Sequence, residues 1–194
     1  MSLLIVGLVL FLGVHSVVIV APTLRAGTIQ ALGEGAWKGM YALVSLVGFV
    51  LICYGFGLAR QAPLILYSPP AWLRYVAVIL MLPVFTLLIA AYLPGRIKTA
   101  AKHPMLAAVK LWAFAHLLAN GMLGDVLLFG GFLAWAVADR ISLKRRSIPQ
   151  VPPTAPPGRW NDAIAVVLGL AIYALLIGWA HARLFGVPPL GPTA

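Results

Sequence analysis

Long apolar runs separated by short polar connections dominate the hydropathy pattern of the chain. About 20 apolar residues are needed to cross roughly 30 Å of hydrocarbon, and this criterion predicts about six membrane helices. They lie near residues 2–22, 39–58, 72–93, 105–120, 123–139 and 162–184. The fourth and fifth are short and are separated only by residues 121–124, which predicts a tight helical hairpin. The fold class we expect is an all-α, polytopic membrane bundle.

The first apolar run has two possible interpretations, a cleaved signal peptide or a retained helix. It lacks a basic segment at its start and continues to Pro22 before the first basic residue, Arg25. Signal peptides have a basic start and a shorter apolar core. We therefore interpret this run as a retained first helix.

Composition supports a membrane protein and changes how the positive charge is interpreted. Hydrophobic residues make up 62% of the 194 residues and charged residues only 9%, whereas about a quarter of the residues of a soluble domain are charged. The net charge of +10 would suggest nucleic acid in a soluble protein, but here the basic residues lie in connections between apolar runs. Topology explains them better, so we expect membrane lipid and no nucleic acid as a partner.

The basic residues fall unevenly on alternate connections. The connections after the first, third and fifth helices, with the start of the fourth helix, hold Arg25, Lys38, Arg96, Lys98, Lys102, Lys110, Arg140, Lys144, Arg145, Arg146 and Arg159. The opposite side holds only Arg60, Arg74 and Arg183. Because positive charge is retained in the cytoplasm, both termini are predicted to be non-cytoplasmic. The expected location is the bacterial inner membrane, as a multi-pass protein.

A proline-rich segment divides the predicted domains. Residues 147–160 read SIPQVPPTAPPGRW, and this composition excludes a helix because proline lacks the amide donor and restricts the preceding residue. We expect a five-helix membrane domain at 1–145, a cytoplasmic strap at 146–161, and an additional helix and tail at 162–194. The strap is interpreted as a semi-rigid tether.

Cysteine and acidic residues exclude several chemistries. Cys53 is the single cysteine, so the chain has no internal disulfide, no thiolate zinc site and no C-x-x-C-H motif for covalent haem. The acidic residues are only Glu34, Asp125, Asp139 and Asp162. None is predicted to lie deep in a helix, which argues against paired-carboxylate catalysis and a carboxylate proton pump.

Two histidines lie within apolar helices, His15 in the first and His116 in the fourth. A polar ring in a bilayer needs a partner or a metal, and spacing alone leaves both readings open. The predicted depths of the two rings differ by roughly 6 Å at 1.5 Å per residue, so they can face each other. A non-covalent haem with one imidazole on each axial position would satisfy both rings. Its propionates would then point toward Arg25, Arg96 and Lys102.

Other residues near these histidines have an ordinary interpretation as well. Trp112, His116 and Asn120 share one helix face, which suits either a ligand pocket or a polar packing seam. His103 and His181 are predicted at helix ends, where histidines are usually solvated. Aromatic side chains are candidates to line an apolar cleft, with no catalytic role assigned to them: Phe11, Trp37, Tyr41, Phe85, Trp112 and Phe114.

Three sequence blocks resemble the NnrU family of bacterial membrane proteins. They are V-H-S at 14–16, LGEGAWKGMYALVSLVGFVLICYG at 32–55 and KHPMLAAVKLWAFAHLLANG at 102–121. The resemblance covers about residues 1–145, and the strap and the sixth helix are interpreted as more variable additions. The family is similar to plastid 15-cis-zeta-carotene isomerase through the same blocks.

The resemblance implies a cofactor and two alternative roles. It implies haem b, with His15 and His116 as axial ligands of the iron and His103 as the H-P residue of the third block. One implied function is redox-dependent cis–trans isomerisation of a linear polyene such as zeta-carotene. The alternative is a non-catalytic accessory or sensor linked to nitrite and nitric oxide reduction, with membrane redox partners. A membrane methyltransferase is a third reading, with fewer matching polar residues.

Overall fold

The computed structural model describes residues 1–146 and 154–191, and α-helices dominate this part of the chain. Within this described part, five helical segments are able to cross a membrane by length and composition, and a sixth apolar helix, Pro104–Ala119, is shorter. The prediction of an all-α membrane bundle is confirmed. The chain forms two compact units, Met1–Ser68 with Gly121–Arg145 and Pro69–Asn120 with Arg146–Ala194. Each unit joins segments that are distant in sequence, and each is described separately below.

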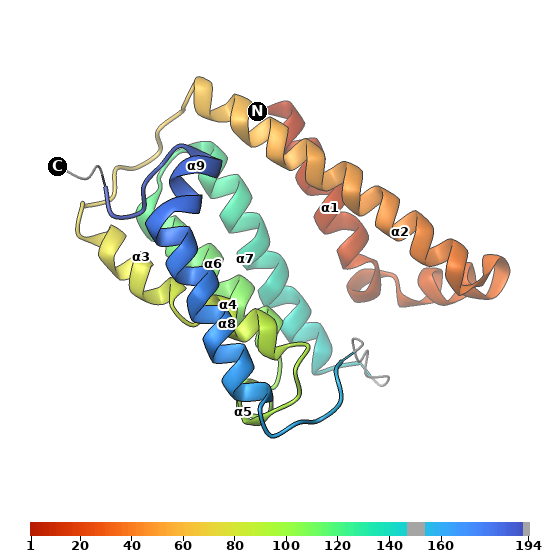
Figure 1. The fold of residues 1–194 in the computed structure, drawn as a ribbon. Helices are drawn as coiled ribbons and strands as arrows, with labels where there is room; N and C mark the ends of the chain where they lie inside the picture. The colour runs from red at the N-terminus through yellow and green to blue at the C-terminus, as the bar shows by residue number, and fades with distance from the viewer. Residues whose placement is uncertain (147–153, 192–194) are drawn as a thin grey trace. The chain divides into compact units, whose positions relative to one another are not determined.

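Unit 1 is built on a helical hairpin of α1 (Ser2–Val20) and α2 (Pro22–Gln61), to which α7 (Leu123–Leu143) adds a third helix. Figure 1 shows α1 and α2 lying side by side. The two helices are in close contact because glycines on each helix face the backbone of the other. A Cβ on Gly7 would meet Ile52 N at 2.6 Å, and a Cβ on Gly48 would meet Phe11 N at 2.7 Å. Small residues allow helices to approach closely in membranes, where dispersion contributes much of the association.

Helix α2 is much longer than the predicted span of 39–58. It begins at Pro22, which suits the first turn of a helix because its missing amide has no partner there. It bends at Gly33, whose φ of 85° and ψ of 159° are non-helical. Glycine has no Cβ and so takes this positive φ without a steric penalty. The connection predicted between the first and second helices is therefore itself helical, with a kink at Gly33.

Unit 1 is closed by hydrogen bonds between the segment after α2 and the start of α7. The amides of Leu66 and Leu123 donate to the carbonyls of Gly121 and Leu64, both at 2.8 Å. Asp125 in the first turn of α7 is only 2% exposed, and its Oδ2 accepts from the Met122 amide at 3.1 Å. A carboxylate here satisfies an amide that helix geometry leaves unpaired.

Unit 2 contains α3 (Leu73–Met81), α4 (Val84–Ala90), α5 (Arg96–Ala101), α6 (Pro104–Ala119), α8 (Asn161–Leu175), the π-helical turn η1 (Leu176–Ala180) and α9 (His181–Phe185). The predicted helix at 72–93 is interrupted before Pro83, because proline cannot donate to the helical ladder. The predicted helix at 162–184 is found as α8, η1 and α9 in succession.

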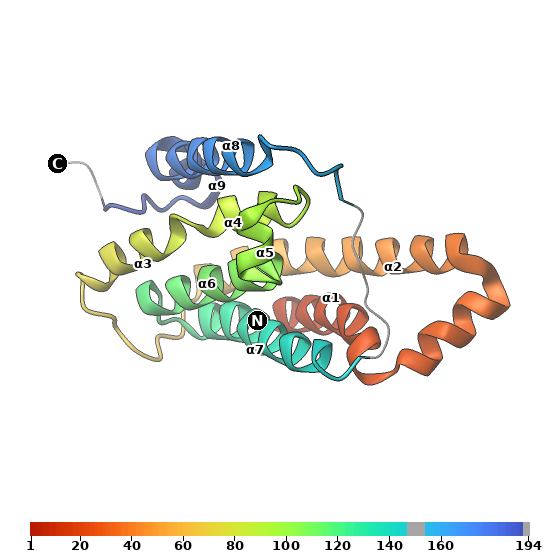
Figure 2. The ribbon, with the colours of Figure 1, turned by 90° about the horizontal axis from the view of Figure 1, so that it is seen from below.

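Helix α8 packs along α4, as Figure 2 shows. At their crossing Gly169 lies against the backbone and hydroxyl of Thr86, with Thr86 N 2.5 Å from an added Cβ. The Tyr173 hydroxyl donates to Val78 O on α3 at 2.9 Å. The last helix is thus an integral part of unit 2.

The described end of the proline-rich strap is not helical, as predicted, while residues 147–153 lie outside the described residues. The amide of Ala155 donates to Tyr92 O at 2.9 Å. The Asn161 side-chain amide donates to Pro94 O at 2.8 Å and to Pro156 O at 3.1 Å. These bonds attach the strap's end to the connection between α4 and α5.

Candidate functional site

His15 lies in α1 with its ring oriented by the preceding turn. Its Nδ1 is 2.6 Å from Phe11 O. A carbonyl oxygen only accepts hydrogen bonds, so Nδ1 carries the proton and Nε2 keeps its lone pair in the neutral ring. The ring also stacks on the Phe11 ring, with centroids 4.3 Å apart and planes at 25°.

Three helices contribute aromatic rings around His15. The Tyr41 ring of α2 lies 5.1 Å from the imidazole, and the Trp135 ring of α7 lies 6.0 Å from it, edge to face. Phe11 additionally contacts Phe132 of α7 at 5.7 Å. We call His15, Phe11, Tyr41 and Trp135 the His15 aromatic layer. Phe11 and Tyr41 were among the aromatic residues expected to line a cleft.

Two buried polar groups of unit 1 have no hydrogen-bond partner among the described residues. They are Trp135 Nε1 and Ser45 Oγ. A buried donor without an acceptor costs roughly 1–3 kcal/mol, and such groups in a native protein call for an explanation such as a bound ligand. Trp135 belongs to the His15 aromatic layer, so this donor lies next to the histidine.

His116, near the end of α6 in unit 2, repeats the arrangement of His15. Its Nδ1 is 2.8 Å from Trp112 O, which makes Nε2 the basic nitrogen here too. The Trp112 ring lies 5.5 Å from the imidazole, and the Asn120 side-chain amide donates to His116 O at 2.9 Å. The rings of Trp112 and His116 are in contact on α6, whereas Asn120 follows the helix and reaches the backbone carbonyl of His116.

His181 is the second histidine of unit 2 that bears on this region. It begins α9 directly after the π-helical turn, and its Nδ1 is 2.6 Å from Val187 O. It belongs to the same unit as His116. His181 is therefore a necessary variant in any test of the histidines.

Comparison with known protein families identifies the chain. The sequence profile of the family described as NnrU protein matches residues 3–189. This chain belongs to the NnrU family. No curated protein and no solved structure matches it.

The extent of the NnrU match corrects one expectation. The resemblance was expected to end near residue 145, with the strap and sixth helix as additions, but the match continues to residue 189. The structure gives a physical reason, because α8 packs against α4 and its first residue, Asn161, donates to Pro94 O in the connection after α4. The last helix belongs to the family pattern.

The NnrU residues predicted to hold a cofactor fall in both units. His15 lies in unit 1 and His116 in unit 2. A ligand shared by the two histidines stays a prediction.

The three basic residues expected near haem propionates lie in loops and helix ends. Arg25 is in the first turn of α2, Arg96 begins α5, and Lys102 follows α5 with a φ of 59°. Lys102 precedes α6 whereas His116 lies in its last turn, so roughly 21 Å of helix separates them at 1.5 Å per residue. Their contacts to a propionate stay predictions.

Sequence reasoning missed two polar residues that order unit 2, Asn161 and Asp162. The Asp162 carboxylate accepts the amides of Arg96 at 2.8 Å and Ile97 at 3.1 Å. It thereby caps α5 from 66 residues away in sequence, and no local pattern can reveal such a pairing. Ser45 and Trp135 were missed because a serine or tryptophan in an apolar helix is usually a packing residue.

Proposed function

We propose that this NnrU-family protein binds haem b in the bacterial inner membrane, with His15 and His116 as axial ligands of the iron. The observation that carries the proposal is that the two imidazoles have the same hydrogen-bonding arrangement. Each Nδ1 donates to the carbonyl four residues earlier, at 2.6 Å and 2.8 Å. Metal-bound histidines generally donate their other ring nitrogen in this way, which fixes the tautomer and orients the ring.

The surroundings of His15 suit a flat apolar group. Aromatic rings on α1, α2 and α7 flank the imidazole at 4.3–6.0 Å. Trp135 Nε1 and Ser45 Oγ supply two buried donors for oxygen atoms of a bound molecule. The residues present therefore fit a haem.

Bound haem b supplies a redox-active iron and a planar apolar macrocycle. His15 and His116 would hold it through their Nε2 atoms, backbone carbonyls would orient both rings, and the aromatic side chains around His15 would exclude water. The aromatic layer also offers contact to a conjugated apolar chain. We propose that the activity is redox-dependent cis–trans isomerisation of a linear polyene such as zeta-carotene.

The test is a reduced-minus-oxidised absorption spectrum of the full chain purified in detergent, with a pyridine haemochrome assay for haem type and stoichiometry. We expect low-spin b-type bands at about one haem per chain. His15→Ala and His116→Ala each remove the bis-histidine spectrum, whereas His181→Ala retains it. Because His181 belongs to the same unit as His116, loss in H181A with retention in H15A would refute the His15 assignment.

Misfolding is separated from ligand loss by chemical rescue. In His15→Gly, added imidazole should restore the low-spin spectrum, because it refills the position of the missing ring. A protein that has merely unfolded would not respond. Absence of haem from the wild-type chain, after expression with adequate haem supply, would overturn the proposal.

Activity is tested separately with the haem-loaded protein in vesicles. A cis isomer of zeta-carotene is added under reducing and oxidising conditions, and the products are separated by chromatography. We expect conversion to the trans isomer only after reduction, and none by H15A or H116A. Haem binding without conversion would refute the isomerase and leave the accessory or sensor role in nitrite and nitric oxide reduction.

A further inference from the structure

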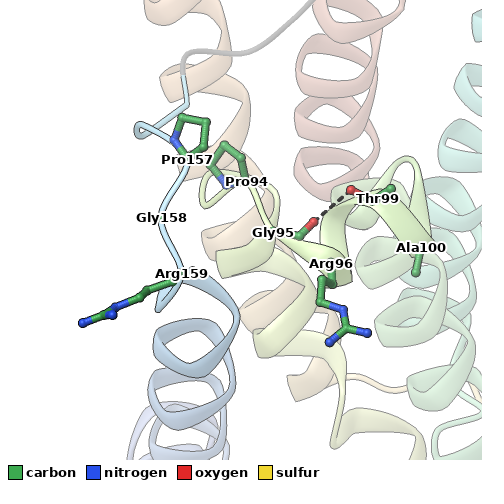
Figure 3. Close-up of a pocket in the computed structure, with 8 residues that line it drawn as sticks. All are labelled: Pro94, Gly95, Arg96, Thr99, Ala100, Pro157, Gly158 and Arg159. Carbon is green, nitrogen blue, oxygen red and sulfur yellow. Dashed lines mark hydrogen bonds between the residues drawn. The ribbon is translucent and has the colours of Figure 1, made fainter.

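An open hollow of about 880 Å³ lies where the connection before α5 meets the end of the strap in unit 2. Pro94 and Gly95 form one wall and Pro157 and Gly158 the other, as Figure 3 shows. Two arginines, Arg96 and Arg159, also line it. Their guanidinium groups extend away from the backbone on either side of these walls.

The charge around this hollow is uncompensated. Of the residues assigned to unit 2, Asp162 is the single acidic one. Its carboxylate is already bound to the backbone amides of Arg96 and Ile97. No ion pair to either arginine side chain is found among the described residues, and Arg159 instead lies over the Trp160 ring at 5.3 Å. Both arginine side chains are exposed, so they are accessible to an anion.

The walls of the hollow are held rigidly. Asn161 bonds to Pro94 O and Pro156 O, and Asp162 bonds to the start of α5. Thr99, which also lines the hollow, donates its hydroxyl to Gly95 O at 3.0 Å. The α5 amides are occupied, so an anion must bind through the arginine side chains and not through the helix end.

An apolar groove continues from the hollow along α8. It holds about 450 Å³ and is lined by the apolar side chains of Trp160, Ala163, Ile164, Val167 and Leu168. Val167 is 65% exposed and Trp160 62%. Because Arg159 and Trp160 are consecutive residues, a charged hollow and an apolar groove adjoin at the start of this helix.

We propose that unit 2 binds one anionic phospholipid at this place, with its phosphate at the hollow that Arg96 and Arg159 line and an acyl chain along α8. Each half of the surface matches one half of such a lipid: basic side chains attract anionic headgroups at a membrane surface, and acyl chains bury exposed apolar side chains. The proposal is independent of haem binding. A free phosphate would use the arginines but not the groove.

The test compares lipid binding to the full chain in detergent by native mass spectrometry. Phosphatidylglycerol and phosphatidylcholine with identical acyl chains are titrated against wild type and Arg96→Gln/Arg159→Gln. We expect a preference for phosphatidylglycerol that falls about fivefold for each arginine removed, or about 25-fold for both. Arg74→Gln/Arg183→Gln is the matched control, because it removes the same charge from the other end of unit 2 and should keep the preference.

A second comparison distinguishes the lipid from a free anion. Soluble glycerol phosphate at millimolar concentration should not displace phosphatidylglycerol, and Trp160→Ala should weaken phosphatidylglycerol without creating affinity for glycerol phosphate. Displacement by glycerol phosphate would show a small-anion site and overturn the lipid. Equal loss of preference in both arginine pairs, or in neither, would show that the hollow is not the site.

Discussion

Gly7→Ala is the sharpest test of the helical hairpin in unit 1. Gly7 faces α2, where a Cβ would lie 2.6 Å from Ile52 N and 2.9 Å from Gly48 O. Both atoms belong to helical backbone, so neither can move alone. Ordinary contact begins at 3.4 Å, and the shortfall of 0.8 Å (3.4 − 2.6) must be met by separating α1 from α2.

The cost of this separation follows from the short range of dispersion. A gap of 0.5–1 Å forfeits about a quarter to a half of the attraction between atoms in contact, and overpacking costs typically about 1–3 kcal/mol. Alanine is favoured over glycine in a helix by up to about 1 kcal/mol. Because the atoms nearest a Cβ on Gly7 would be backbone atoms, at 2.6–2.9 Å, the overpacking cost falls in the upper part of its range, about 2–3 kcal/mol. The expected net loss of stability is then about 1–2 kcal/mol.

The assay is thermal unfolding of purified protein in detergent, followed by tryptophan fluorescence. A loss of this size lowers Tm by about 2–8 °C in a chain of this length. Gly57→Ala is the matched control, since Gly57 lies on α2 with nothing within 4 Å of its Cβ position, and its Tm should be unchanged or slightly higher. Equal Tm shifts in the two variants would refute the close-contact explanation.

Three smaller changes test other parts of the structure. Ser45→Ala removes a buried hydroxyl that has no partner among the described residues, so the haem-free protein should be as stable or about 1 kcal/mol more stable by thermal unfolding; a clear loss would show a missed partner. Tyr173→Phe removes the hydrogen bond to Val78 O and should cost about 0.5–1 kcal/mol in the same assay. Asp162→Asn weakens the cap on α5 and should cost about 1 kcal/mol. Hydrogen exchange at the start of α5 should then rise, and unchanged exchange would contradict the capping role.

The sequence determined the helical class and the approximate places of the apolar helices. A backbone in hydrocarbon must satisfy its own hydrogen bonds, so an apolar run of about 20 residues has few alternatives to a helix. For the same reason α6, α7 and the last helix begin within a few residues of their predicted starts. The two histidines were also visible, because a polar ring stands out in an apolar run.

Where the predicted helix bounds were wrong, the residues responsible are visible in the sequence. Pro83 divides the predicted third helix, and Gly33 allows a kink that extends the second helix backwards to Pro22. Hydropathy alone overlooked both, because it measures partition into lipid and not backbone conformation. The site was predicted only in part. His15 and His116 stand out within their own helices in the sequence, whereas the residues that surround their rings do not.

Only the tertiary structure decided which distant residues meet. Tyr41 and Trp135 come to His15 from two other helices, and Asp162 reaches the start of α5 across 66 residues. The hollow between Pro94–Gly95 and Pro157–Gly158 likewise requires two segments to be brought together. Sequence periodicity specifies the faces of single helices. Which faces pair depends on the close fit between side chains and backbone of distant segments, and that fit exists only in the folded protein.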